Sequence, residues 1–133
     1  MAGNHEFLNA FINNSSTIAE KAGADIPEPA HKAVMYDGDG NVVLATDGSK
    51  AIGVILSDTL DPVKKGQTVN ILIKYIGLLE VSDAINKGDF VTVDNGLGKT
   101  AESGDFIFGR AFTSPTAAGE CVQVQINPMG YMA

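Results

Sequence analysis

The stretch INKGDFVTVDNGLG, residues 85–98, decides the fold. Its first part places Gly88 between a lysine and an aspartate, directly before an alternating run in which Val91 and Val93 share one face. Glycine adopts positive φ angles without steric cost, and a polar side chain after it caps a turn. Asn95-Gly96 then forms a strong turn signal. The stretch therefore predicts a turn, a β-strand and a second turn, and no catalytic chemistry.

The same phrase occurs twice more along the chain. Lys65-Gly66-Gln67 precedes the apolar run 68–73, and Ala118-Gly119-Glu120 precedes the alternating run 121–126. The copies are 22 and 31 residues apart, judged by their glycines, which is too irregular for a solenoid. We interpret the phrase as a repeated way of starting strands within one β domain.

Short runs of β-type residues continue through the rest of the chain. The turn residues of 37–40 separate the first two runs as a hairpin. A turn signal every 8 to 15 residues, as seen here, is typical of an all-β sandwich or a small barrel. The predicted strands are 33–36, 41–45, 52–56, 68–76, 78–82, 89–94, 106–112 and 120–126.

The first 32 residues have a different pattern. Residues 5–22 have apolar side chains at helical spacing, but residues 13–16 are poor helix formers, so the segment is at best a marginal amphipathic helix. Pro27 and Pro29 then favour an extended linker. We predict an arm and linker at 1–32, partly helical or extended, and a β-rich domain at 33–133. The apolar stripe of the arm comprises Phe7, Leu8, Phe11, Ile12 and Ile18.

Charge and composition exclude several classes of function. The chain has 133 residues and a formal net charge of -7, with 16 acidic against 9 basic residues. Nucleic acids and anionic membrane surfaces bind through an excess of lysine and arginine, so we expect neither as a partner. No run approaches the ~20 apolar residues of a membrane span, and the first residues do not resemble a signal peptide. Synthesis in the cytoplasm is the expectation.

The sequence offers few residues for catalysis or metal binding. Residues 37–41 begin like a calcium loop, but Val42 replaces the required glycine and Gly48 the required glutamate. His5 and His31 have no zinc ligands at the usual spacing, and Cys121 has no histidine within the predicted β domain. We therefore predict no enzyme, no catalytic residue, no cofactor and no metal.

The ordered set of motifs resembles the capsid decoration, or cement, proteins of tailed bacteriophages. The resemblance covers residues 33–127 and depends on the order of segments that are individually simple strands and turns. These are AVMYDGDGNVVLA (33–45), AIGVILS (51–57), GQTVNILI (66–73), INKGDFVTV (85–93), GRA (109–111) and AAGECVQV (117–124).

This resemblance implies a compact β-barrel or β-tulip-like decoration domain that assembles as a homotrimer on the outer surface of the virion. It implies that the protein binds the major capsid protein of the expanded head and cements neighbouring capsomers against internal DNA pressure. Family members commonly use an N-terminal segment for this contact, so the apolar stripe of the arm is the predicted capsid-binding site. The alternative is a carbohydrate- or cell-surface-binding β module, in which Tyr36, Tyr75 and Tyr131 would stack on sugars.

Overall fold

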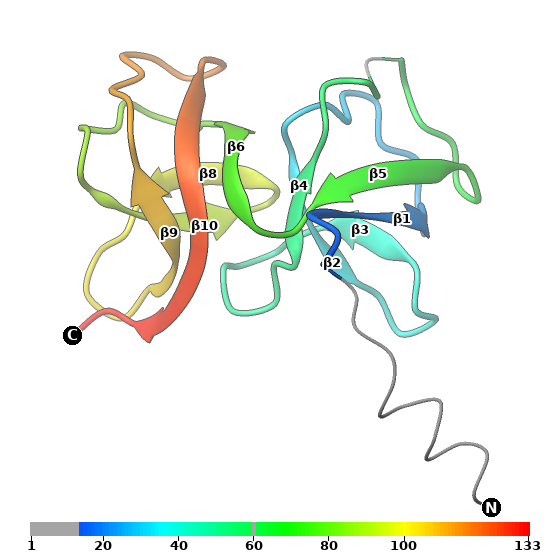
Figure 1. Ribbon diagram of the computed structural model, residues 1–133, viewed down its shortest axis with the longest axis horizontal. Coiled ribbons are helices and arrows are strands. Elements are labelled where there is room, and N and C mark those ends of the chain that lie inside the picture. Colours follow the sequence, from blue (N-terminus) through cyan, green and yellow to red (C-terminus); the bar gives the residue numbers. More distant parts are fainter. Residues whose placement is uncertain (1–13, 60) are drawn as a thin grey trace, which may run out of the picture.

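The computed structural model describes residues 14–59 and 61–133, and within them the protein consists of two five-stranded antiparallel sheets that lie side by side (Figure 1). The first sheet has the order β1-β5-β4-β2-β3 and the second the order β6-β10-β9-β7-β8. The prediction of a mainly β fold is therefore confirmed. The strands of the first sheet are β1 (Thr17–Lys21), β2 (Ala33–Tyr36), β3 (Val42–Leu44), β4 (Gly53–Ile55) and β5 (Thr68–Leu72). Those of the second are β6 (Tyr75–Glu80), β7 (Phe90–Asp94), β8 (Leu97–Thr100), β9 (Phe106–Ala111) and β10 (Cys121–Tyr131).

The turn that contains Gly88 shows how the strands begin. Gly88 has a φ of 94°, and the Asp89 N–H donates to the Asn86 carbonyl at 3.0 Å. The Asp89 carboxylate in turn accepts from the Asn86 N–H at 3.1 Å. The turn also binds the end of the neighbouring strand β9, because Gly88 N–H donates to the Ala111 carbonyl and Ala111 N–H donates to the Asp89 carbonyl. A positive φ at the third position is the mark of a type II turn.

The same arrangement occurs at four places, which is one more than the sequence indicated. In each turn the residue after the glycine bonds back to the start of the turn through both its backbone and its side chain, and the glycine N–H donates to the end of the adjacent antiparallel strand. The glycines are Gly66, Gly88, Gly104 and Gly119, and their acceptors are the carbonyls of Ala22, Ala111, Met132 and Val81. The turn at Gly104 precedes β9 and was not predicted.

The predicted hairpin across 37–40 and the predicted turn at Asn95-Gly96 are both confirmed. β2 and β3 pair across residues 37–40, where Asp37 Oδ1 accepts from the N–H groups of Asp39 and Asn41. β7 and β8 pair across Asn95 and Gly96, which both have positive φ values, 49° and 81°. These values fit a type I′ hairpin. β8 itself, with glycine and lysine at its centre, has little β propensity, and the sequence did not predict it.

Of the two conformations predicted for the arm, helical and extended, the described part adopts the extended one, because Thr17–Lys21 form strand β1. β1 pairs with β5, and its residues alternate between exposed and half-buried. Pairing with a preformed edge outweighs a weak helical preference in a segment of poor helix formers. This part of the predicted arm therefore belongs to the first sheet. Residues 5–13 lie outside the described residues, and the arm remains a prediction for them.

Two further boundaries differ from the predictions. The run 68–76 is not one strand, because Tyr75 has a φ of 71° and the chain changes direction there from β5 into β6. β10 extends to Tyr131, beyond the predicted end at 126, after an irregularity between Ile126 and Gly130. Pro128 lies within that irregularity, as expected for a residue that cannot donate to a ladder.

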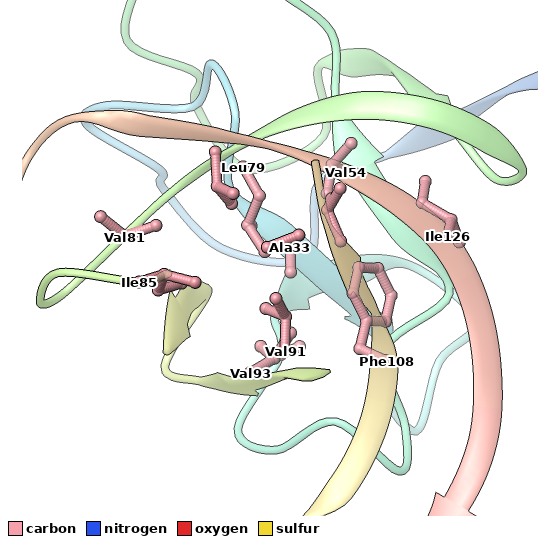
Figure 2. Close-up of a cluster of buried hydrophobic side chains, with 13 residues drawn as sticks. Ala33, Val54, Leu79, Val81, Ile85, Val91, Val93, Phe108 and Ile126 are labelled. Atoms are coloured by element: carbon pink, nitrogen blue, oxygen red, sulfur yellow. The ribbon is translucent and has the colours of Figure 1, made fainter. Parts of the chain in front are cut away.

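The two sheets share a hydrophobic core. One buried cluster contains Phe108 and Leu79 from the second sheet together with Ala33 and Val54 from the first (Figure 2). A second cluster lies within the first sheet around Ile55 and Ile71. The edge strands β6 and β8 approach each other next to an isolated bridge between Val81 and Gly98, so the second sheet curls strongly without becoming a fully hydrogen-bonded barrel.

Candidate protein-binding surface

The residues predicted to contact a capsid lie mostly outside the described part of the chain. Phe7, Leu8, Phe11 and Ile12 lie outside the described residues, so their contact with a capsid stays a prediction. Ile18 is described: it lies on β1, is half-buried, and packs against the cluster of the first sheet. Its contact within the protein is thus established, whereas its contact with a capsid stays a prediction.

The structure shows a different apolar surface on strand β6, at one edge of the second sheet. Three of its side chains are large, apolar and exposed: Tyr75 (63%), Ile76 (50%) and Leu78 (41%). We call this set the apolar edge. Leu79, which also belongs to β6, is fully buried in the core, so the strand has apolar residues on both of its faces. Exposed apolar residues on an edge strand are an aggregation hazard unless a partner covers them.

The residue that begins the apolar edge has an unusual backbone conformation. Tyr75 has a φ of 71°, a value that costs a non-glycine residue about 1–3 kcal/mol. Its ring is exposed, and the Lys74 ammonium lies 5.1 Å from the ring centroid. Glycine would adopt this turn more easily, as it does before four other strands. Retention of a strained tyrosine at an exposed position is typical of a functional residue.

A groove runs beside the apolar edge, between β6 and β4. It has a volume of about 260 Å³ and is lined mainly by apolar groups, among them Val54, Leu56 and Leu72. None of the described residues that line it is acidic, although the chain has a net charge of -7. Ile76 and Leu78 pair across the ladder with Gln125 and Gln123, which are exposed and uncharged. The groove is therefore lined without acidic residues on an acidic protein, and the charged group nearest to Tyr75 is the Lys74 ammonium.

An ion pair fixes the end of β6 against the first sheet. Lys32 Nζ lies 2.7 Å from Glu80 Oε1, and the two side chains are 9% and 26% exposed. The Glu80 N–H also donates to the His31 carbonyl at 2.9 Å. These contacts fix the positions of the two sheets beside the groove. A rigid surface loses less conformational entropy when it binds a partner.

Cys121 lies opposite Glu80 in the β6–β10 ladder. Burial, together with the nearby Glu80 carboxylate, raises the pKa of the Cys121 thiol above its usual value, and Lys32 offsets only part of this effect. A raised pKa leaves little thiolate at neutral pH, and the thiolate is the reactive form. The position is that of a packed side chain and does not favour nucleophilic catalysis.

The described residues contain no group of three or more histidine, cysteine, aspartate or glutamate side chains placed to hold a metal ion. The same part of the chain contains no helix of the length and hydrophobicity that a membrane crossing requires.

The sequence did not reveal the apolar edge. In the sequence, Tyr75 suggests only a sugar-stacking role, and Ile76 and Leu78 fit ordinary strand positions. The available signal was the run YIGLLE, residues 75–80, which has apolar residues on both faces and therefore fits a strand buried on both sides. Only the fold shows that one of those faces is open.

Comparison with known proteins identifies the family. A search of curated proteins found no match. Among solved structures, the chain is similar to one described as the head fiber gp8.5 N base in bacteriophage phi29, with a TM-score of 0.65 and 18% identity over 88% of this chain and 97% of that one. That likeness concerns the fold. The family model for the structural cement protein (E217 gp24/Pam3 gp6) matches residues 8–127, nearly the whole chain, and the chain therefore belongs to this family of phage structural proteins.

Proposed function

We propose that this protein binds the outer surface of an expanded phage capsid and cements neighbouring capsomers, so that the head withstands internal DNA pressure. The family supports a structural role in the virion. The observation that carries the proposal further is the apolar edge of β6, because its exposed side chains need a protein surface to cover them.

The chemistry of the apolar edge suits contact with the major capsid protein. Tyrosine is enriched among the residues that dominate the energetics of protein interfaces, and aliphatic side chains around such a residue exclude water from the contact. Here they stand beside an apolar groove that could receive a partner side chain. The rest of the protein is acidic, and this keeps copies from associating at random.

A homotrimer would add avidity to this contact. Three copies held together present three capsid-binding surfaces, and each contact after the first becomes intramolecular. The predicted arm residues Phe7, Leu8, Phe11 and Ile12 would supply further contacts to the major capsid protein, in the way an apolar segment orders on binding. Measurement of the molar mass in solution by sedimentation tests the trimer.

Binding to purified empty shells tests the main proposal. Wild-type protein should sediment with expanded shells and not with unexpanded ones. The double variant Ile76→Ser/Leu78→Ser should lose at least about tenfold in affinity, the equivalent of about 1.4 kcal/mol, since two interface side chains are removed. Met129→Ser is the matched control, because Met129 is equally exposed (42%) but lies at the end of β10.

Two outcomes would contradict parts of the proposal. If wild-type protein binds neither kind of shell, it is not a cement for that capsid. If the control variant weakens binding as much as the double variant does, the apolar edge is not the contact surface. Removal of residues 1–13 tests the arm separately, and unchanged affinity would exclude it.

A further inference from the structure

Strand β6 has unpaired backbone groups beside the apolar groove. It pairs with β10 on one side, and its other side faces the first sheet (Figure 1). In an antiparallel ladder, successive residues direct their backbone groups alternately toward the partner strand and away from it. Val81 N–H donates to the Glu120 carbonyl at 2.9 Å, in register with the ladder, so every second residue from Tyr75 to Val81 bonds to β10. The N–H and C=O groups of Ile76 and Leu78 therefore point away from β10, and we call them the open edge of β6.

The open edge is short and has a defined end. The next outward N–H group along the strand, that of Glu80, already donates to the His31 carbonyl at 2.9 Å. Within residues 14–59 and 61–133, the outward backbone groups of Ile76 and Leu78 have no such partner. Three non-glycine residues in this part of the chain have a positive φ, and two of them, Tyr75 and His31, stand at the two ends of the open edge. The open edge thus accepts an extended segment of about four residues.

A strand added to the open edge would meet apolar groups on both of its faces. On one face its neighbours are the exposed side chains of Ile76 and Leu78. On the other face, a Cβ at Gly77 would stand 2.6 Å from a Leu72 methyl carbon and 3.2 Å from a Val54 methyl carbon, and both of these residues line the groove. Neighbouring positions of a strand point to opposite faces. The segment that fits therefore has apolar side chains at consecutive positions as well as at alternating ones.

The N-terminal part of the same chain has this pattern. Residues 7–12 read FLNAFI. In an extended conformation Phe7 and Phe11 share one face, and Leu8 and Ile12 share the other. The segment carries no charge, and the groove is lined without acidic residues. Its composition therefore matches both faces of the open edge.

The described chain begins close to the open edge. The Ile73 N–H donates to the Ser16 carbonyl at 2.9 Å, and Tyr75 begins β6 two residues later. Figure 1 shows the start of β1 at the corner between β5 and β6. Seven extended residues span up to about 23 Å, whereas Leu78 lies about 10 Å along β6 from Tyr75. Residues 7–12 of the same copy therefore reach the open edge, and the short tether gives them a high effective concentration there.

We propose that in the free protein residues 7–12 add to β6 as a short strand and cover the apolar edge of their own chain. The backbone groups of Ile76 and Leu78 gain partners, and the exposed side chains beside them are shielded from solvent. A capsid protein that binds the apolar edge displaces the segment and frees it for contacts of its own. The inference rests on the proposed function only for this displacement, since the covering contact is a property of the free protein.

Amide hydrogen exchange of the full chain, without shells, tests the proposal. The amides of Ile76 and Leu78 should exchange at least about tenfold more slowly in the wild-type protein than in Phe7→Ser/Phe11→Ser. The Gly77 amide points toward β10 and is the internal control, so it should be equally protected in both proteins. Asn9→Ser changes a polar residue of the same segment and should leave all three amides as in the wild type.

Three results would overturn the inference. Exchange of the Ile76 and Leu78 amides at the rate of free amides in the wild type would show that the edge stays open. Equal protection in the wild type and in Phe7→Ser/Phe11→Ser would show that another group covers it. Protection that increases with protein concentration would assign the covering segment to a second copy. Each of these results leaves the proposed cement function intact because no capsid is present, and a failure of shell binding would leave the exchange result standing.

Discussion

The two sheets are built by the same devices, but they differ in what they leave open to solvent. In the first sheet one large apolar side chain is exposed among the described residues, Tyr36, and its hydroxyl donates to Glu20. The second sheet exposes the apolar edge of β6 and, at the end of β10, Met129 and Tyr131. The first sheet thus looks like the supporting half of the molecule and the second like the half that makes contacts.

The two sheets differ in their exposed side chains, but they share one of the two buried clusters. The cluster around Phe108 takes Ala33 and Val54 from the first sheet, so the second sheet does not bury its apolar residues alone, although the first sheet also has a cluster of its own. This makes a specific claim about folding: the two sheets should unfold as one cooperative unit.

The largest expected effect comes from the shared core. Phe108→Ala removes a fully buried ring and should cost about 3–5 kcal/mol of unfolding free energy. Ile71→Ala, in the cluster of the first sheet, should cost about 2–5 kcal/mol. Denaturant titration gives the totals, and amide hydrogen exchange shows which strands open. Loss of protection in the second sheet alone after Phe108→Ala would show that the halves are independent.

The ion pair between the halves should give the next largest effect. Glu80→Ala leaves the Lys32 ammonium largely buried without its partner, and we expect a loss of about 3 kcal/mol, the lower end for a broken buried pair because Glu80 is partly exposed. Lys32→Met/Glu80→Leu removes both charges and should fold with nearly wild-type stability. A double variant no more stable than Glu80→Ala would mean that the pair itself holds the sheets together.

These comparisons show what the sequence could and could not predict. A glycine followed by a polar residue, directly before an alternating run, predicts a turn with a positive φ from local sequence alone. The structure confirms this prediction at Gly66, Gly88 and Gly119. Gly104 has the same signal, Ser103-Gly104-Asp105 before a β run, and could have been found in the same way.

Other features depend on partners that are distant in the chain. β1 is a strand because β5 offers an edge, and residues 17–21 carry no strong β signal of their own. Similarly, Ile76 and Leu78 look like core residues until the strand order places β6 at an edge. A surface pocket lined by Asp47, Thr92 and Tyr131 likewise joins segments that are some 40 residues apart in sequence, and no local pattern links them.

The turns allow a sharper test of the contrast between structural and functional positions. Gly88→Ala places a Cβ in open space, so it should lower the unfolding free energy only by the backbone cost of a positive φ, about 1–2 kcal/mol.

Tyr75→Gly removes a strained residue and should change the unfolding free energy by less than about 1 kcal/mol, while it weakens shell binding. Gly38→Ala, also in open space but without a positive φ, is the control and should be neutral or slightly stabilising. If Tyr75→Gly destabilises as much as Gly88→Ala does, Tyr75 has a structural role.

The smallest expected effect lies at the joint between the sheets, where Asp47 in the first half bridges Asp94 in the second. Hydrogen bonds from Ser49 lower the pKa of the Asp47 carboxyl. A group with a lowered pKa in the folded state stabilises the protein above its unfolded pKa of about 3.9, and this contribution is lost as the pH falls through the folded value. Ser49→Ala should therefore reduce stability slightly at pH 7 and leave it unchanged near pH 2. Because Asp47 is exposed, solvent keeps the difference small. Thermal melting from pH 7 to pH 2 measures it, and an equal loss at both ends would show that Ser49 acts through packing and not through the Asp47 charge.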